Sequence, residues 1–278
     1  MNAWLDKLRE ALDDAPRPVA FFFRDDDAGW RDDRLLELLD LFARYSMPLD
    51  VAAIPGALTS QAAAELRARV EAEPARVAIH QHGFAHRNHE PEGRRKCEFG
   101  IAREQALQQS DIEEGQRRLA DLFGPRLSPI FTPPWNRCAS VTGECLLRTG
   151  FRVLSRDATA APLNLDGLLE LPVTIDWFAR ARGVRLGLDE LGASMACAVE
   201  TSSAPVGIMF HHALMDETES AHAGELLALL ASHRNAQRSL MERLIPNSSH
   251  DTAAQVYRGK AAGWPQFAMP ALTTAERK

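Results

Sequence analysis

The chain has 278 residues, of which 45% are hydrophobic and 25% charged, and its formal net charge is −6. This composition is typical of a globular protein with enough apolar residues for one large core. The sequence has no basic stripe with interleaved aromatic residues, which argues against nucleic-acid binding. No run reaches the roughly 20 apolar residues of a membrane span. The N-terminus lacks the basic start and apolar stretch of a signal peptide, so we expect a cytoplasmic protein.

Apolar runs alternate with amphipathic segments along most of the chain. Strands are predicted at residues 19–23, 49–54, 77–80, 128–132, 151–154, 168–175 and 205–210. Helices are predicted at residues 1–12, 35–45, 60–70, 103–123, 141–149, 189–200, 226–233 and 236–244. Strands that alternate with helices imply parallel pairing with right-handed crossovers, in either a barrel or an open doubly wound sheet.

The position of the chemically active residue types favours the barrel. These residues follow five of the predicted strands, always at the C-terminal end. In a barrel such ends form one ring, where active sites lie, whereas an open sheet brings together only the strands at its switch point. We therefore predict a distorted seven-stranded parallel (β/α) barrel, similar to a TIM barrel, over residues 1–246. Glycines and prolines interrupt the pattern in residues 247–278, for which we expect a partly ordered tail.

Three consecutive aspartates, Asp25, Asp26 and Asp27, follow the first predicted strand. Like charges this close raise one another's pKa unless a cation lies between them. The triplet therefore indicates either a cation site or a solvated turn that caps the next helix.

Four of the nine histidines, His80, His82, His86 and His89, lie close together after the third strand. Imidazole is the commonest side-chain metal ligand, and a catalytic zinc usually has three protein ligands and one open position. A surface or hydrogen-bonded histidine is the alternative for each member. The cluster as a whole, with carboxylates at a neighbouring strand end, favours a metal.

Further candidates follow three other strands. His211 and His212 end the last strand, where a histidine can act as a general acid or lie in an ordinary loop. Trp135 follows the fourth strand and either lines a sugar-binding groove or is buried. Asp176 either orients a histidine or belongs to a turn. The sequence contains no GxSxG elbow and no phosphate-binding loop.

The order of these segments resembles the polysaccharide deacetylase family, which is the NodB homology domain of carbohydrate esterase family four. The corresponding segments are Asp26-Asp27, His82-Gly83-Phe84-Ala85-His86, Pro133-Pro134-Trp135, Asp176-Trp177 and Met209-Phe210-His211. Each motif is short, but the ordered set extends over residues 19–212 and is therefore more specific than any one of them.

The resemblance implies a divalent metal bound by Asp27, His82 and His86. Zn²⁺ is the expected ion, with Co²⁺ and Ni²⁺ as alternatives. His80 is then expected beside the site or in the substrate groove, and His89 outside it.

The resemblance also implies the catalytic groups. Asp26 would be the general base toward the nucleophilic water, and His211 or His212 the general acid, with Asp176 orienting it. Trp135 would wall the acetyl pocket, and its backbone N–H would help to hold the oxyanion.

The sequence departs from the family pattern at two places. The triplet allows Asp25-Asp26 as the pair, although the glycine that follows favours Asp26-Asp27. The arginine that tethers the base in the family's third motif is Thr132 here. Arg24 or Arg137 is a candidate replacement, and we expect both of these, with Asp25, near the substrate.

The implied function is that of a metal-dependent hydrolase that removes acetyl groups from an N- or O-acetylated sugar or glycan precursor. One alternative is a metal-dependent hydrolase of a non-sugar amide on the same fold. A second is a non-catalytic carbohydrate-binding domain with a degraded site, which the missing arginine favours. An acetylated carbohydrate is the expected partner, and the sequence does not specify an oligomeric state.

Overall fold

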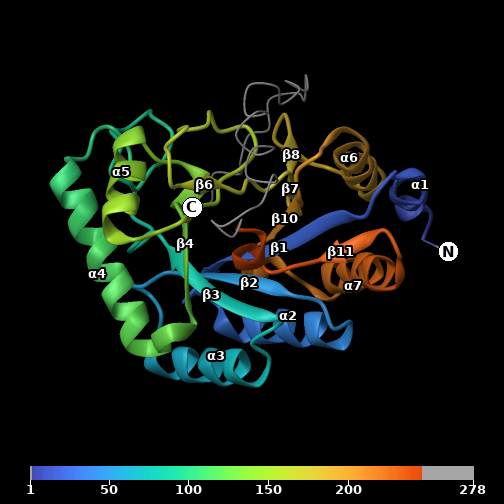
Figure 1. Ribbon diagram of the computed structural model, residues 1–278, viewed down its shortest axis with the longest axis horizontal. Helices are drawn as coiled ribbons and strands as arrows, with labels where there is room; N and C mark the ends of the chain where they lie inside the picture. Colours follow the sequence, from blue (N-terminus) through green and yellow to red (C-terminus); the bar gives the residue numbers. More distant parts are fainter. Residues whose placement is uncertain (1, 246–278) are drawn as a thin grey trace.

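The computed structural model describes residues 2–245, so the tail expected at residues 247–278 lies outside this range. Within it, one nine-stranded sheet curls into a half-barrel of parallel strands, with helices around its outside (Figure 1). Neighbouring strands follow the order β6-β5-β4-β3-β2-β1-β10-β7, and β11 also pairs with β1. The predicted class, a distorted parallel (β/α) barrel, is confirmed.

The strands of this sheet are β1 (Val19–Ala28), β2 (Leu49–Ala53), β3 (Val77–His82), β4 (Leu127–Thr132), β5 (Val153–Leu154), β6 (Leu169–Glu170), β7 (Ile175–Asp176), β10 (Val206–Phe210) and β11 (Ala236–Arg238). A separate hairpin consists of β8 (Arg180–Ala181) and β9 (Val184–Arg185).

The α-helices are α1 (Asp6–Asp14), α2 (Asp32–Arg44), α3 (Ser60–Ala72), α4 (Gln105–Phe123), α5 (Ser140–Thr149), α6 (Leu188–Thr201) and α7 (Glu217–Ser232). Short 3-10 turns lie at Ala3–Leu5, Gly124–Arg126, Pro134–Asn136, His212–Leu214 and Met241–Leu244.

The apolar run of β1 shows why the functional groups lie at the rim of the sheet. Phe21 and Phe23 pack into the cluster that includes the surrounding helices, whereas Phe22 packs with Met209 and Met241 in a second cluster on the other face of the strand. Both faces of the strand are therefore apolar, as expected of a parallel sheet covered on both sides. Because the interior is filled with side chains, as in other barrels, the polar site lies at the C-terminal strand ends.

The strand predicted at residues 168–175 is two short strands, β6 and β7. Pro172 lies between them and has no N–H for a ladder hydrogen bond, so the run cannot continue as one strand. The two pieces lie at opposite ends of the strand order. The sheet therefore contains more strands than the seven predicted.

The helix predicted at residues 236–244 is wrong. Residues Ala236–Arg238 form β11, which pairs in parallel with the start of β1, and a 3-10 turn follows at Met241–Leu244. The backbone N–H of Val19 donates to the carbonyl of Asn235 at 2.7 Å. Tertiary pairing with β1 therefore overrides the local helical pattern.

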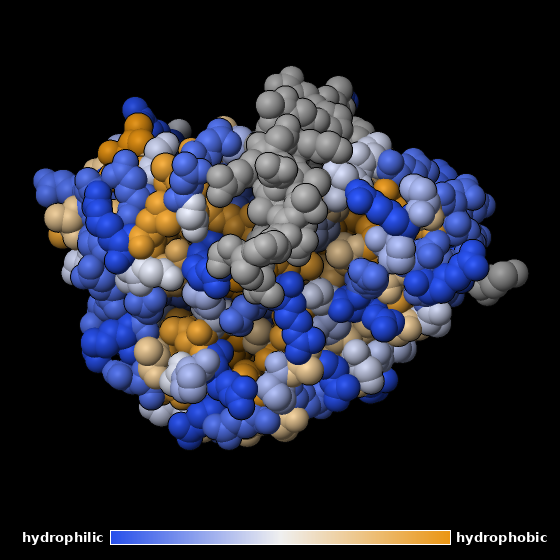
Figure 2. Space-filling view, viewed as in Figure 1, coloured by the Kyte–Doolittle hydropathy of each residue, from blue (hydrophilic) through white to orange (hydrophobic). Residues whose placement is uncertain are grey.

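The face in Figure 2 is hydrophilic over most of its rim, and hydrophobic residues show mainly toward its middle. Among the described residues, no helix is long and apolar enough to cross a membrane.

Candidate active site

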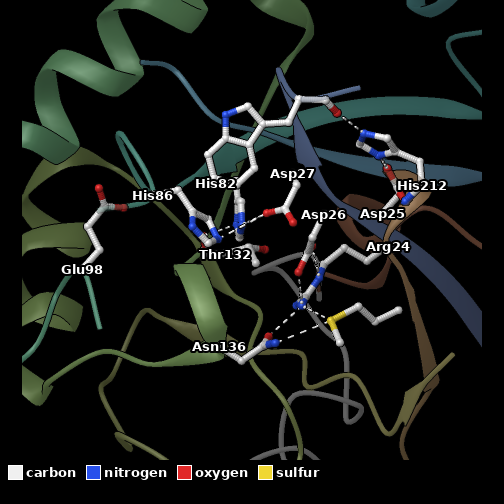
Figure 3. Close-up of polar contacts among 12 residues, drawn as sticks. Arg24, Asp25, Asp26, Asp27, His82, His86, Glu98, Thr132, Asn136 and His212 are labelled. Carbon is white, nitrogen blue, oxygen red and sulfur yellow. Dashed lines mark hydrogen bonds and ion pairs between the residues drawn. The ribbon is translucent and has the colours of Figure 1, made fainter. Parts of the chain in front are cut away.

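The C-terminal end of β1 directs two aspartates into the site through a bulge. Arg24 and Asp26 lie on the same face of the strand because side chains alternate. Asp25 pairs with Val51 of β2, and Ala28 pairs with Ala53. The interval is three residues on β1 but two on β2, so β1 contains one extra residue, which forms a β-bulge. Asp27 has a positive φ of 75° at this bulge. Asp26 and Asp27 therefore both face the site, although they are neighbours in a strand (Figure 3).

Arg24 holds Asp26 with two hydrogen bonds in the buried wall of the site. Its Nε donates to Oδ1 at 2.8 Å and its Nη2 to Oδ2 at 2.9 Å. The guanidinium also donates to Ser155 Oγ at 2.8 Å and to Asn136 Oδ1 at 2.7 Å. Burial acts to raise the pKa of Asp26, but the positive charges of Arg24, His82 and His211 together outweigh it and leave the pKa lowered. Asp26 is therefore an oriented, ionised carboxylate. Arg24, which we expected near the substrate, is fully buried and is placed against Asp26, Ser155 and Asn136.

Asp27, His82 and His86 bring three potential ligand atoms together. Asp27 Oδ1 lies 3.1 Å from His82 Nε2 and 3.3 Å from His86 Nε2, and the three ligand atoms all lie within 4.8 Å of one another. His82 Nδ1 donates to the carbonyl oxygen of Thr132 at 3.0 Å. In neutral His82, the lone pair is consequently on Nε2, the nitrogen that faces Asp27.

This donor set fits a divalent cation. The contact of neutral His82 with the Asp27 carboxylate places acceptor against acceptor, so a positive charge is required between them, either a proton or a metal. Burial acts to raise the pKa of Asp27, but hydrogen bonds with the two histidines outweigh it and hold the pKa well below its usual value. Burial acts to lower the pKa of His82, yet Asp27 and Asp26 leave it raised. The site therefore has the negative potential that favours a cation, and two imidazoles with a carboxylate are ligands typical of catalytic zinc.

His80 does not reach a groove. It is fully buried, and a hydrogen bond of 2.9 Å joins its Nε2 to Thr132 Oγ1. Burial, together with the charge of Arg24, lowers the pKa of His80 to about 3, so the ring is neutral. Thr132, which stands where the family has arginine, thus contacts His80 with its hydroxyl and His82 with its carbonyl. Of the two positions expected for His80, the structure has the one beside the site rather than the one in a substrate groove.

His212 and Asp25 form a buried ion pair beside the site. The backbone N–H of His212 donates to Asp25 Oδ1 at 2.8 Å, and its Nδ1 donates to Oδ2 at 2.6 Å. Its Nε2 donates to the carbonyl of Trp30 at 2.6 Å. Burial acts to lower the pKa of His212, but Asp25 outweighs it and raises the pKa to about 9. Both ring nitrogens of His212 are therefore engaged in hydrogen bonds, which favours His211 as the candidate acid, and the Asp25 carboxylate faces His212.

His211 is left as the candidate acid. It is partly exposed, and its Nδ1 has no hydrogen-bond partner among residues 2–245. Its charge contributes to the lowered pKa of both Asp26 and Asp27, which places it near them. Asp176 pairs in register with Met209, so the two side chains lie on the same face of the sheet. His211 is two residues after Met209, and because side chains alternate along an extended chain, it lies on that face too. Asp176 Oδ1 accepts the backbone N–H of Phe178 at 2.9 Å.

Two tryptophans enclose the ring of His86. The ring centroid of Trp135 lies 4.4 Å from that of His86, and the ring centroid of Trp30 lies 4.8 Å from it. Trp30 is 41% exposed, so part of its ring is open to a ligand. Arg137 Nη1 donates to the carbonyl of Lys96 at 3.0 Å, and Arg24 rather than Arg137 holds Asp26.

Four residues of the site were not singled out from the sequence: Trp30, Glu98, Asn136 and Ser155. Trp30, Asn136 and Ser155 follow the ends of β1, β4 and β5, so the rule that strand ends carry the chemistry could have found them. Glu98 lies in a polar loop without periodicity and has no such signal. Its carboxylate accepts three backbone N–H groups from the loop that carries His86.

No family model matches the sequence, and no curated protein matches it. Among solved structures, a candidate polysaccharide deacetylase from Mycobacterium smegmatis is similar, with 14% identity, a TM-score of 0.64 and coverage of 94% of this chain and 96% of that chain. A family 4 carbohydrate esterase from Streptomyces lividans, in complex with acetate, has 15% identity and a TM-score of 0.52 over 80% of this chain and 92% of that chain. A mutant of a pseudoenzyme of the same esterase family, with restored enzymatic activity, has 10% identity and a TM-score of 0.52 over 80% of this chain and 65% of that chain.

These similarities establish the fold. The half-barrel of parallel strands is the one found in polysaccharide deacetylases and family 4 carbohydrate esterases. The resemblance inferred from the ordered motifs is confirmed at this level.

Proposed function

We propose that the protein is a metal-dependent hydrolase that removes acetyl groups from an N- or O-acetylated sugar or glycan precursor. The observation that carries the proposal is that two groups of residues lie side by side at the C-terminal ends of the strands. One is the carboxylate of Asp26 held by Arg24, and the other is the ligand set of Asp27, His82 and His86. The shared fold supports the same reaction class.

A divalent ion held by Asp27, His82 and His86 would polarise the acetyl carbonyl and lower the pKa of water to about 7. Zn²⁺ is the ion we propose, with Co²⁺ and Ni²⁺ as alternatives. Asp26 accepts the proton of the attacking water. Its two hydrogen bonds with Arg24 fix the carboxylate in the ionised form that a general base requires.

His211 supplies the second proton transfer. The bond from the acetyl carbon to the nitrogen or oxygen of the sugar breaks, and His211 donates a proton to the leaving amine or alcohol. Asp176, on the same strand face, is proposed to orient the imidazole. A base and an acid on separate strands, β1 and the end of β10, can act on opposite sides of the reacting carbon.

Aromatic groups and a backbone donor complete the proposed pocket. Trp135 walls the acetyl group, and its backbone N–H is proposed to stabilise the developing oxyanion. The exposed part of Trp30 offers a flat apolar surface to a sugar ring on the other side of His86.

The position of Arg24 also bears on the binding-only alternative. That alternative depended on Thr132 standing where the family has an arginine. Arg24 provides the guanidinium from β1 instead, and its two hydrogen bonds with Asp26 support the proposal that this carboxylate is the base. A non-sugar amide substrate uses the same groups, so only substrate tests separate it from an acetylated sugar.

The experiment is a substrate panel with the full chain, stripped with a chelator and reloaded with Zn²⁺, Co²⁺ or Ni²⁺. N-acetylglucosamine oligomers and acetylated xylan are compared with small linear and cyclic amides, and released acetate or amine is quantified. We expect acetate from at least one acetylated sugar with reloaded protein. Hydrolysis of the non-sugar amides alone would favour the amide hydrolase, and sugar binding without acetate release under all three metals would contradict catalysis.

A further inference from the structure

The loop after β3 closes on the buried carboxylate of Glu98 (Figure 3). Glu98 Oε1 accepts the backbone N–H groups of Ala85 at 2.8 Å and Arg87 at 3.2 Å, and Oε2 accepts that of Phe84 at 3.0 Å. The Glu98 residue is fully buried. Hydrogen bonds to an ionised acceptor are roughly twice as strong as those between neutral groups, so this carboxylate is a strong local restraint on the loop.

The loop has a backbone shape that needs such a restraint. His86 has a φ of 53°, a left-handed conformation that non-glycine residues adopt at a free-energy cost. Gly83 has a φ of 55°, and a Cβ on it would lie 2.2 Å from Glu98 Oε2. The carboxylate thus occupies the space that a side chain at position 83 would require, and the loop folds around it.

The two histidine ligands are held by different means. His82 is the last residue of β3, pairs with Thr132 and donates its Nδ1–H to the carbonyl of that residue. His86 lies beyond the strand, between Ala85 and Arg87, whose backbone N–H groups both bind Glu98 Oε1. A change at Glu98 should therefore displace His86 and leave His82 in place.

We propose that Glu98 is a positioning residue for the metal centre, which holds the loop so that His86 Nε2 faces Asp27. This inference rests on the proposed function only in taking Asp27, His82 and His86 to be metal ligands. Glu98 touches none of the three side chains that would bind the ion and acts through the backbone on either side of His86.

Two variants of Glu98 remove its hydrogen bonds to the loop to different extents. Glu98→Ala removes all three hydrogen bonds. Glu98→Gln keeps one carbonyl oxygen but sets an amide N–H₂ against at least one backbone N–H of the loop, so support is partial. Gln108→Ala is the matched control: Gln108 is also fully buried and donates to the carbonyls of Gly100 and Arg103, in the neighbouring loop.

The experiment titrates the metal-free full-length variants with Co²⁺ and follows the visible d–d absorption, with a competing chelator to obtain Kd. Loss of outer-shell support typically weakens metal binding by about 10–100-fold. We expect a loss in this range and an altered absorption spectrum for Glu98→Ala, and an intermediate Kd for Glu98→Gln. Gln108→Ala should keep the wild-type Kd and spectrum even though its Tm falls.

Wild-type Co²⁺ affinity and spectrum in both Glu98 variants would overturn the inference and leave the proposed function intact. An equal loss of affinity in Gln108→Ala would overturn it too, because general loosening of the loops would then explain the effect. If Glu98→Ala does not fold, Glu98→Gln decides by the same criteria. Graded Co²⁺ binding with no acetate release by the wild type would support the inference while contradicting the proposed function.

Discussion

Arg24 and Asp26 lie two residues apart on the inner face of β1, and the guanidinium of the first binds both carboxylate oxygens of the second, at 2.8 and 2.9 Å. Both residues of the pair come from the same strand, so the guanidinium contact to Asp26 does not involve β4. Thr132, at the end of β4, instead forms hydrogen bonds with His80 and His82.

Replacing Arg24 by lysine should impair the base without removing the positive charge. Lysine offers a point charge rather than a two-point contact, so Asp26 loses orientation, and its pKa rises because the compensation for burial weakens. We expect kcat to fall by about 10–100-fold, which is less than the roughly 10²–10⁴-fold that a general base contributes, because Asp26 itself is still present. The acid limb of the profile of kcat/KM against pH should move to higher pH.

Arg137→Lys is the control for this variant. Arg137 donates to the carbonyl of Lys96, so its replacement should leave the acid limb where it is. An acid limb that stays fixed in Arg24→Lys, or moves equally in both variants, would show that Arg24 does not tune the base.

The two adjacent histidines should separate into one catalytic and one structural residue. His211→Ala should lower kcat by about 10²–10⁴-fold on a sugar acetamide or acetate, because the leaving group then departs without a proton. The rate with an aryl acetate, whose phenol leaves without a proton, should be close to that of the wild type. Steady-state kinetics on the two substrates measure this difference, and equal losses on both would remove His211 from the role of acid.

His212→Gln should act on stability instead. The pKa of His212 is raised to about 9 from its usual 6.5, so its ion pair with Asp25 contributes full stability below about pH 6.5. That contribution is lost as the pH rises through about 9. We expect the variant to lose about 3–5 kcal/mol at pH 6, the usual effect of breaking a buried ion pair, and clearly less at pH 10. Urea unfolding at both pH values measures this, and an equal loss at both would contradict a charged His212.

Asp50 should destabilise the protein as the pH rises. Its Oδ2 accepts the backbone N–H of Met241 at 3.0 Å, and its Oδ1 has no partner within residues 2–245. Burial, with the nearby charge of Glu242, raises the pKa of Asp50 to about 8. The folded state therefore retains a proton that the unfolded chain releases near pH 4, and stability falls between about pH 4 and 8.

Asp50→Asn should remove this dependence. The amide has a similar shape and no charge, and can still accept from Met241. We expect the variant to be more stable than the wild type by about 1–3 kcal/mol at pH 9, because the wild type then buries an ionised carboxylate, which costs more than a buried neutral amide. The difference in unfolding free energy should shrink toward pH 4. A variant that is less stable than the wild type at pH 9 would contradict the conclusion that the buried charge of Asp50 destabilises the folded protein at high pH.

The sequence predicted those parts of the site that depend on strand ends. Asp26 and Asp27 lie at the C-terminal end of β1, His82 ends β3 and His86 follows it, and parallel strands bring those ends together whatever their details. From the sequence, the choice between Asp25-Asp26 and Asp26-Asp27 as the functional pair depended only on the glycine that follows the triplet. In the structure, Asp25 contacts His212, and a bulge between Asp25 and Ala28, which depends on pairing with β2, brings Asp26 and Asp27 to the same side.

Other features depend on contacts between distant segments and leave no local pattern. Asp25 and His212 are neighbours in space because β10 pairs with β1, so the ion pair could not be read from either motif alone. Glu98 reaches the histidine loop from a segment without periodicity. The strand at β11 has a helical pattern that pairing with β1 overrides.

The most direct test of the metal centre is the dependence of acetate release on bound metal. The full chain is stripped with a chelator, titrated with Zn²⁺ and assayed on the best acetylated sugar, alongside His82→Ala and Asp27→Ala. We expect the stripped wild type to be inactive, its activity to rise until one Zn²⁺ is bound per chain, and neither variant to recover. Full activity of the stripped wild type, or wild-type Zn²⁺ binding by the two variants, would contradict a metal centre at Asp27, His82 and His86.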